Sequence, residues 1–186
     1  MHEIQAETNR EVTELSRFEE LLDPVYPDAV RFARGLMGSA EEGDDLLQDA
    51  LVRAWKGFPR LREPGRFKPW LFRIIRNGHR SRARRRRLVH WLSLSGADHV
   101  PAPEGISFEA KEVVRLALKR VPRTQREAVV LFEVLGMSID EIAEIQGTTS
   151  SAVKSRLFRG REKLRDAYER LSRWEGESWP AKCPRG

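Results

Sequence analysis

The sequence predicts an all-α fold of two small helical domains joined by a flexible linker. Apolar residues recur every three or four positions through most of the chain, which is the spacing of amphipathic helices. No segment alternates apolar and polar residues as a half-buried strand does. Residues 88–107 lack the helical period and contain prolines, glycines and serines, so we assign them to the linker. With 186 residues in total, each domain can form only a thin core.

The expected N-terminal domain spans residues 16–87 and follows a charged leader, residues 1–15, that we expect to be disordered. A first apolar stripe begins near Phe18 and ends at Gly38, which is suited to close a helix. Ser39 then starts a capping-box pattern that predicts a second helix. The apolar residues of the second and third predicted helices are Leu47, Ala50, Leu51, Ala54 and Trp55, then Phe67, Trp70, Leu71, Ile74 and Ile75.

The expected C-terminal domain spans residues 108–171 and is followed by a mobile tail, residues 172–186. After a first helix that ends before Pro122, the spacing of Thr124 and Glu127 predicts a capping box at the start of the next helix. A further capping box, starting at Ser138, predicts a short helix. The domain is therefore expected to contain several short helices and one long one.

A helix-turn-helix is the most specific pattern in this domain. Ala143 allows close helix approach, Gly147 can adopt a left-handed turn, and Val153 anchors the second helix on the first. Thr149 is placed to cap that second, longer helix. With Val153 and Leu157 buried, the opposite face is basic and hydroxyl-rich, which suits phosphates and base edges. That face comprises Ser150, Ser151, Lys154, Ser155, Arg156, Phe158, Arg159 and Arg161.

Two interpretations of this helix face remain open on charge alone. It is either a solvated basic surface or a DNA-recognition surface, and the helix-turn-helix context favours DNA. An aromatic residue on such a helix is more often a core or dimer contact. The position of Phe158 between Lys154 and Arg161 favours contact with a thymine methyl group in the major groove.

A run of arginines ends the N-terminal domain. Residues 73–87 contain eight arginines and no acid, an arrangement that repels itself unless it is solvated or meets a polyanion. A phosphate clamp on nucleic acid is the preferred interpretation, and a solvated helix end is the alternative. Trp70 lies just before this run and can stack on an unpaired base, although its helical spacing favours core packing.

Composition excludes several functional classes. No apolar stretch approaches the roughly 20 residues of a membrane-spanning helix, so we expect a soluble, cytoplasmic protein without membrane insertion. Cys183 is the single cysteine and the four histidines are scattered, so we expect no metal and no other cofactor. No constellation of positioned acids or nucleophiles is present, which argues against an enzyme acting on nucleic acid.

Taken together, three stretches resemble the extracytoplasmic-function (ECF) group of sigma factors in the sigma-70 family. The resemblance covers about residues 16–171. It is carried by Asp45-Leu46-Leu47-Gln48-Asp49 through Arg53-Ala54-Trp55, by Phe67-Lys68-Pro69-Trp70-Leu71-Phe72-Arg73-Ile74 to Asn77, and by Ile142-Ala143-Glu144 through Val153-Lys154-Ser155-Arg156-Leu157.

The resemblance implies an alternative sigma factor that binds core RNA polymerase and directs promoter-specific initiation. It assigns polymerase binding to an acidic helix face that physical reasoning alone would leave as solvated surface: Asp45, Gln48 and Asp49. It assigns minus-ten recognition and melting to the first domain, with Asn77 and a following loop handling a flipped base. The minus-ten residues are Trp70, Arg73, Asn77, Arg80, Arg84 and Arg85.

The C-terminal domain would read the minus-thirty-five element. Its expected contacts are Ser150, Ser151, Lys154, Ser155, Phe158 and Arg159. The resemblance also implies an anti-sigma partner and a linker that threads through the polymerase. The competing hypothesis is a stand-alone helix-turn-helix regulator, in which the N-terminal half would be a dimerisation or sensor domain. It predicts tight DNA binding without polymerase and a self-complementary apolar patch on residues 16–87.

Overall fold

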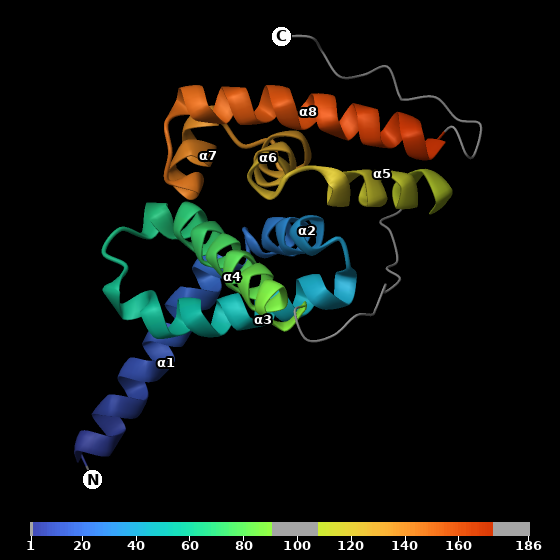
Figure 1. Ribbon diagram of the computed structural model, residues 1–186. Coiled ribbons are helices and arrows are strands. Elements are labelled where there is room, and N and C mark those ends of the chain that lie inside the picture. Colours follow the sequence, from blue (N-terminus) through green and yellow to red (C-terminus); the bar gives the residue numbers. More distant parts are fainter. Residues whose placement is uncertain (1, 91–107, 173–186) are drawn as a thin grey trace.

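A computed structural model describes the backbone of residues 2–90 and 108–172, and the side chains of residues 12–82 and 112–172. This part of the chain is helical and contains no strand, so the all-α prediction is confirmed (Figure 1). The helices are α1 (His2–Leu22), α2 (Tyr26–Met37), α3 (Ala40–Gly57), α4 (Phe67–His90), α5 (Phe108–Arg120), α6 (Arg123–Val129), α7 (Ile139–Gln146) and α8 (Ser150–Ser172). Short 3-10 turns, η1 (Phe58–Arg60) and η2 (Pro64–Arg66), precede α4, and a π-helical turn, η3 (Val130–Val134), follows α6.

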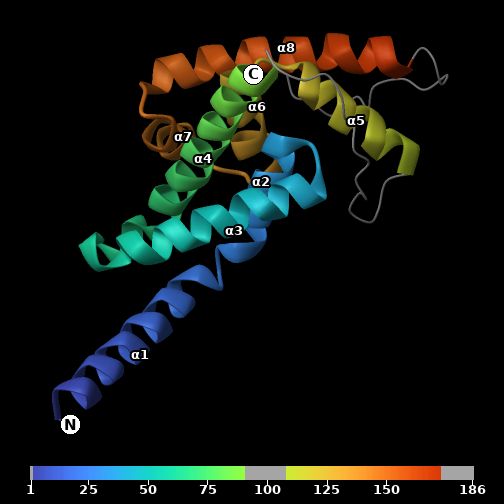
Figure 2. The ribbon, with the colours of Figure 1, turned by 60° about the horizontal axis from the view of Figure 1, so that its bottom comes forward.

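The N-terminal half, α1 to α4, packs around aromatic side chains. The ring of Phe18 lies edge-on to those of Trp55, Phe58 and Phe67, with centroids 5.2–5.5 Å apart. Such edge-to-face pairs stabilise the fold beyond the contribution of the apolar area that they bury. These contacts fix the C-terminal end of α1 on α3 and α4, while the remainder of α1 extends away from the body of the molecule (Figures 1 and 2).

Glycine permits the close packing of α2 on α3. A Cβ atom at Gly43 would lie 2.6 Å from the Cα atom and 2.8 Å from the backbone nitrogen of Arg34. Between the two helices, Gly38 has a φ of 66° in the left-handed region and closes α2. The Ser39 side chain accepts a hydrogen bond from the backbone N–H of Glu42, so the predicted N-cap of α3 is present.

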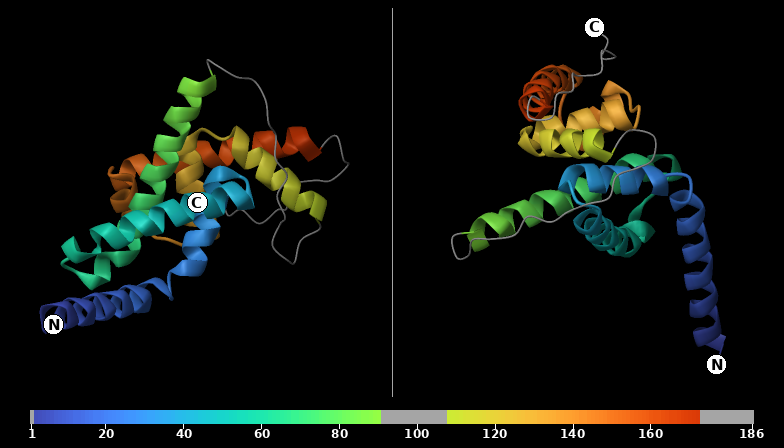
Figure 3. Two further views of the ribbon diagram at one scale, coloured as in Figure 1. Left: turned by 90° about the horizontal axis from the view of Figure 1, so that it is seen from below. Right: turned by 90° about the vertical axis from the view of Figure 1, so that its right-hand side faces the viewer.

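The C-terminal half, α5 to α8, lies directly on the N-terminal half (Figure 3). A Cβ atom at Gly35 of α2 would lie 3.0 Å from a methyl group of Val130 in η3. The guanidinium group of Arg115 on α5 donates to the carbonyl oxygen of Gly38. One hydrophobic core cluster therefore includes residues of both halves, such as Phe72 and Leu131.

The structure differs from two sequence-based expectations about helix starts. Residues 2–15, expected to be disordered, belong to α1, because this segment is rich in strong helix formers although it lacks an apolar stripe. The capping box expected at Thr124 and Glu127 does not form. Helix α6 begins earlier, with Pro122 as a cap that makes no side-chain hydrogen bond, and Glu127 is fully buried.

Some expectations fall outside the described part of the chain. They concern linker residues 91–107, tail residues 173–186 with Cys183, and the side chains of Arg84 and Arg85. Of the linker assigned to residues 88–107, the first three residues belong to α4. None of the described helices is long and apolar enough to span a bilayer.

Candidate polymerase and nucleic-acid interfaces

The helix-turn-helix is built as the sequence predicts. Ser138 and Glu141 form a reciprocal capping box at the start of α7, with hydrogen bonds of 3.3 Å and 2.9 Å. Gly147 closes α7 with a φ of 58°, in the left-handed region where glycine is favoured. The hydroxyl of Thr149 then accepts a hydrogen bond of 3.2 Å from the backbone N–H of Ala152 and caps α8. These local signals fix both ends of the turn.

Buried residues orient α8 over α6 and α7. Val153 is fully buried and Leu157 nearly so. A Cβ atom at Gly160 would lie 2.8 Å from a methyl group of Val129 on α6, so glycine is required for this close approach. Because these residues face inward, the opposite face of α8 is directed away from the protein.

The exposed face of α8 carries most of the predicted DNA contacts. Phe158 is 64% exposed, which is unusual for a large aromatic side chain and excludes a core role within the described structure. The exposed members of the face are Ser151, Lys154, Ser155, Phe158 and Arg159. Ser150 is half-buried, and its hydroxyl donates a 2.6 Å hydrogen bond to Asp140 on α7.

Two arginines that were expected on this face make contacts within the protein instead. Arg156 donates to the Oε1 atom of Gln146 at 2.6 Å, and Gln146 donates to the carbonyl of Thr124 at 3.0 Å. Arg161 forms a 2.6 Å ion pair with Glu133 and lies 5.2 Å above the ring centre of Phe132. The acceptors of both guanidinium groups, Gln146 and Glu133, belong to neighbouring elements, so the local sequence pattern does not predict these contacts.

Helix α4 presents a polar stripe that ends in the arginine run. Trp70, Arg73, Asn77 and Arg80 follow one another at three- and four-residue intervals, so they lie along one side of the helix. The arginines and Asn77 are exposed, while Trp70 is half-buried with its ring centre 5.8 Å from that of Phe67. The expected loop after Asn77 is absent, because α4 continues to His90.

A pocket of about 400 Å³ opens between α3 and α4 beside this stripe. Trp70 and Asn77 line it together with two arginines that the sequence analysis did not select, Arg53 and Arg60. These arginines belong to α3 and η1, so only the tertiary packing brings them to Asn77. The pocket places an aromatic ring, an amide and two cations together.

The acidic face of α3 is exposed as predicted, and its members differ in their partners. Arg82 of α4 forms a 2.5 Å ion pair with Asp49 and donates to the backbone carbonyl of Asp45. Asp44 accepts two hydrogen bonds of 2.8 Å from Arg34, and this pairing lowers the pKa of the Asp44 carboxyl. Among the described residues, none forms an ion pair with the side chain of Asp45, and Gln48 is also exposed.

A buried ionic cluster joins the two halves. Arg76 of α4 donates to Glu127 of α6 at 2.9 Å, and both side chains are at least 93% buried. The Nδ1 atom of His79 lies 3.9 Å from the other carboxylate oxygen, and Arg123 lies 3.8 Å from it. Burial alone would raise the pKa of Glu127, but interactions with His79 and Arg76 outweigh it and the pKa is lowered.

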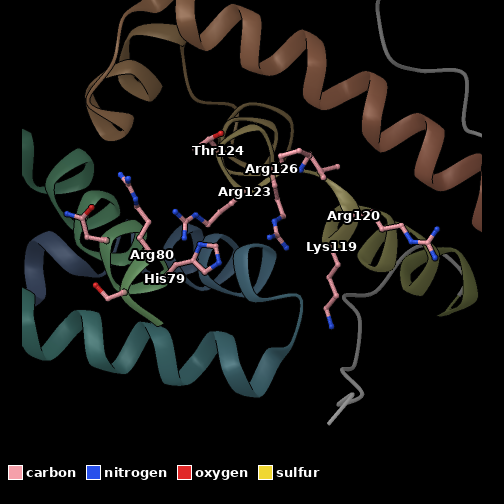
Figure 4. A pocket seen from close by; sticks show the side chains of 11 residues that line it. His79, Arg80, Lys119, Arg120, Arg123, Thr124 and Arg126 are labelled. Carbon is pink, nitrogen blue, oxygen red and sulfur yellow. The ribbon is translucent and has the colours of Figure 1, made fainter. Parts of the chain in front are cut away.

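Beside this cluster, a larger open pocket of about 880 Å³ separates α4 from α5 and α6 (Figure 4). Its lining is strongly basic, and Asn77 and Arg80 of the polar stripe reach it from α4. No group of three or more histidine, cysteine or acidic side chains within the described residues is arranged to hold a metal ion.

Comparison with known families accounts for both halves of the chain. Residues 21–89 match the family Sigma-70 region 2, and residues 111–164 match Sigma-70, region 4. The ECF RNA polymerase sigma factor EcfG of Rhodopseudomonas palustris (strain TIE-1) is 36% identical over 140 residues, which cover 74% of this chain and 77% of EcfG.

The chain is an ECF sigma factor of the sigma-70 family.

Two further comparisons agree with this assignment. The ECF sigma factor SigM of Mycobacterium tuberculosis (strain ATCC 25618 / H37Rv) is 33% identical over 147 residues, covering 79% of this chain and 74% of SigM. The co-crystal structure of the sigma factor RpoE with the anti-sigma factor NepR from Bartonella quintana superposes with a TM-score of 0.71 at 30% identity. It covers 82% of this chain and 96% of that chain.

As a sigma factor, the protein binds core RNA polymerase and promoter DNA and directs promoter-specific initiation. It is a specificity subunit and not an enzyme. The stand-alone regulator is not favoured, because residues 21–89 match Sigma-70 region 2.

Proposed function

We propose that the exposed acidic face of α3 contacts core RNA polymerase through Asp45, Gln48 and Asp49. Asp45 and Gln48 support this role because they are exposed and one helical turn apart, so a partner can reach both. Asp49 is held by Arg82, and a polymerase that binds Asp49 would have to share or displace that arginine. Binding at this face therefore also affects the arginine run of α4.

The α4 stripe and the pocket beside it form the proposed minus-ten site. The ring of Trp70 and the amide of Asn77 line one cavity, which suits stacking and hydrogen bonding of an unpaired base. Arg53 and Arg60 flank the cavity and would neutralise the adjoining phosphates. Along α4, the proposed contacts with the DNA backbone are Arg73, Arg80, Arg84 and Arg85.

The exposed face of α8 forms the proposed minus-thirty-five site, and its exposure is the single observation that carries the DNA-binding proposal. Lys154, Ser155 and Arg159 are directed outward from a fixed helix, as direct reading in the major groove requires. Ser151 and Phe158 are exposed beside them. The hydroxyl of Ser150 donates its hydrogen to Asp140, so its remaining lone pairs can only accept, and we assign it a contact with a donor such as a base amino group.

Regulation by an anti-sigma factor belongs to the same proposal. The similar RpoE was crystallised with the anti-sigma factor NepR, and it covers most of this chain. Packing of the two halves through Arg76 and Glu127 supports a compact state that such a partner could hold in the cytoplasm. The described structure is then a state from which the sigma factor must open to span two promoter elements.

Promoter melting tests the minus-ten assignment. We would place a fluorescent base analogue at the minus-ten element and follow its unstacking by holoenzyme containing Asn77→Ala or Trp70→Ala. Trp70→Ala should reduce opening about tenfold, because base stacking contributes about 1–3 kcal/mol. Asn77→Ala should reduce it by roughly fivefold, because it removes a hydrogen bond of about 1 kcal/mol to the base. Arg62→Ala, an exposed arginine away from the pocket, is the matched control. Normal opening by both variants would move the base-reading site elsewhere.

A further inference from the structure

The open pocket between the two halves has an unusual charge. Five of the residues that line it are lysine or arginine, and no described carboxylate is among the lining residues. Arg80 comes from α4, whereas the others come from α5 and α6 (Figure 4). The five are Arg80, Lys119, Arg120, Arg123 and Arg126. Bringing the halves together therefore concentrates positive charge at this place.

The neighbouring carboxylate, Glu127, offsets only part of this charge. Glu127 is fully buried behind the pocket, with one oxygen bonded to Arg76 and the other nearest to Arg123 and His79. Burial lowers the pKa of Arg126, and Arg123 lowers it further. Burial also lowers the pKa of Lys119, with Arg115 adding to the effect. Glu127 offsets part of this effect for the pKa of Arg126, and Glu42 and Glu112 do so for the pKa of Lys119, but burial is the largest cause and both pKa values stay lowered.

Hydrogen-bonding capacity at the pocket is also unused. The Nε atom of Arg126 is buried and has no hydrogen-bond partner among the described residues. A buried donor without a partner costs free energy, about 1–3 kcal/mol and more for a charged group. Asn77, Ser81 and Thr124 add an amide and two hydroxyls around the same space. An anion with several oxygen atoms would satisfy these groups together.

We propose that this pocket binds a small oligophosphate, a chain of phosphate groups such as that of inorganic tripolyphosphate or a nucleotide tail. Arginine and lysine from two sides suit several phosphates better than one. The volume of about 880 Å³ falls within the range of small-ligand sites. No phenylalanine, tyrosine or tryptophan is among the described residues of the lining, whereas cations are abundant, so phosphate is the group that we expect to be recognised.

Such a ligand would regulate the sigma factor through its conformation. It would contact Arg80 from the N-terminal half and Arg126 from the C-terminal half at once. We call the state in which the two halves are packed together the closed arrangement. A ligand that binds only this arrangement stabilises it by mass action. Oligophosphate would therefore oppose the separation of the two halves and compete with polymerase binding. This inference goes beyond promoter recognition and requires neither polymerase nor DNA for its test.

Calorimetric titration of the full chain with tripolyphosphate at physiological salt tests the site. We expect saturable binding with one ligand per chain. Arg80→Ala and Arg126→Ala should each weaken it about tenfold, since each removes a charge-assisted hydrogen bond. Arg62→Ala should leave it within twofold. Lys119→Ala, at an exposed position, provides a second variant on the C-terminal side if Arg126→Ala fails to fold.

Four results would overturn the proposal. Absence of binding at physiological salt is the first. Equal weakening by Arg62→Ala would indicate general attraction to a basic protein. The third is binding of a short single-stranded oligonucleotide that depends on Arg80 and Arg126 while tripolyphosphate does not bind. That result would assign the pocket to a nucleic-acid backbone. Loss of binding in Arg126→Ala but not in Arg80→Ala would also contradict a ligand shared by both halves.

Discussion

The carboxylate of Glu127 on α6 accepts a 2.9 Å hydrogen bond from Arg76 on α4, in a site that is nearly closed to water. The two residues are 51 positions apart and belong to the segments that match region 2 and region 4. Removing one partner of such a buried pair is strongly unfavourable, because it leaves an uncompensated charge in the interior. The pair therefore forms only when the two halves are packed together, which is the closed arrangement.

Replacing Glu127 should weaken this arrangement. Glu127→Gln leaves Arg76 buried without a counter-charge, and we expect the free energy of unfolding to fall by about 3 kcal/mol at neutral pH. The lowered pKa of Glu127 means that its stabilisation is complete above the ordinary glutamate range and is lost as pH falls below about 4.3. Urea unfolding at several pH values measures the difference.

The matched control is Glu162→Gln, an exposed glutamate on α8. Its free energy of unfolding should stay within about 0.5 kcal/mol of the parent at every pH. The stability difference between parent and Glu127→Gln should shrink as the pH is lowered. A difference that stays constant down to strongly acid pH would show that charge pairing is not its source.

Gly43→Ala tests the packing that presents the acidic face. The new methyl group would lie 2.6 Å from the Cα atom of Arg34, and backbone cannot move aside as a flexible side chain can. We expect a loss of about 1–3 kcal/mol in urea unfolding. Gly65→Ala is the control, since nothing lies within 4 Å of its added Cβ atom. Equal effects at both positions would contradict a specific contact between α2 and α3.

Arg159→Ala tests sequence reading by α8. The guanidinium group is exposed, with its Nε atom donating to the carbonyl of Ser155 in the preceding turn. We expect discrimination between promoters differing in the minus-thirty-five element to fall by about 1–3 kcal/mol, with polymerase affinity unchanged. Competition binding with holoenzyme measures this. A uniform loss on all sequences would make Arg159 a phosphate contact.

Local patterns predicted those parts of the fold that depend on neighbours in sequence. The capping box at Ser138, the left-handed turn at Gly147 and the buried position of Val153 all follow from residues within a few positions. The same rule failed at Glu127, where capping-box spacing was present but the side chain is drawn to Arg76. Tertiary packing, which no local pattern encodes, places this carboxylate beside Arg76.

The candidate interfaces, like the fold, were predictable only where they depend on residues close in sequence. Outward positions such as Lys154 and Phe158 follow from helical periodicity once the buried side of α8 is known. Arg156 and Arg161 were misplaced because their acceptors, Gln146 and Glu133, lie on other elements. The basic pocket could not be predicted, because it exists only where the two halves meet.

Reconstitution with purified bacterial core RNA polymerase tests the central claim most directly. Complex formation and transcription from a promoter library would be compared for the parent, an Asp45→Arg and Gln48→Ala double variant, and Asp23→Arg as an exposed control. We predict stoichiometric binding and promoter-specific initiation by the parent and the control, and loss of both in the double variant. Unchanged polymerase binding by the double variant would contradict the proposed role of the α3 face, and no binding by the parent would contradict the account as a whole.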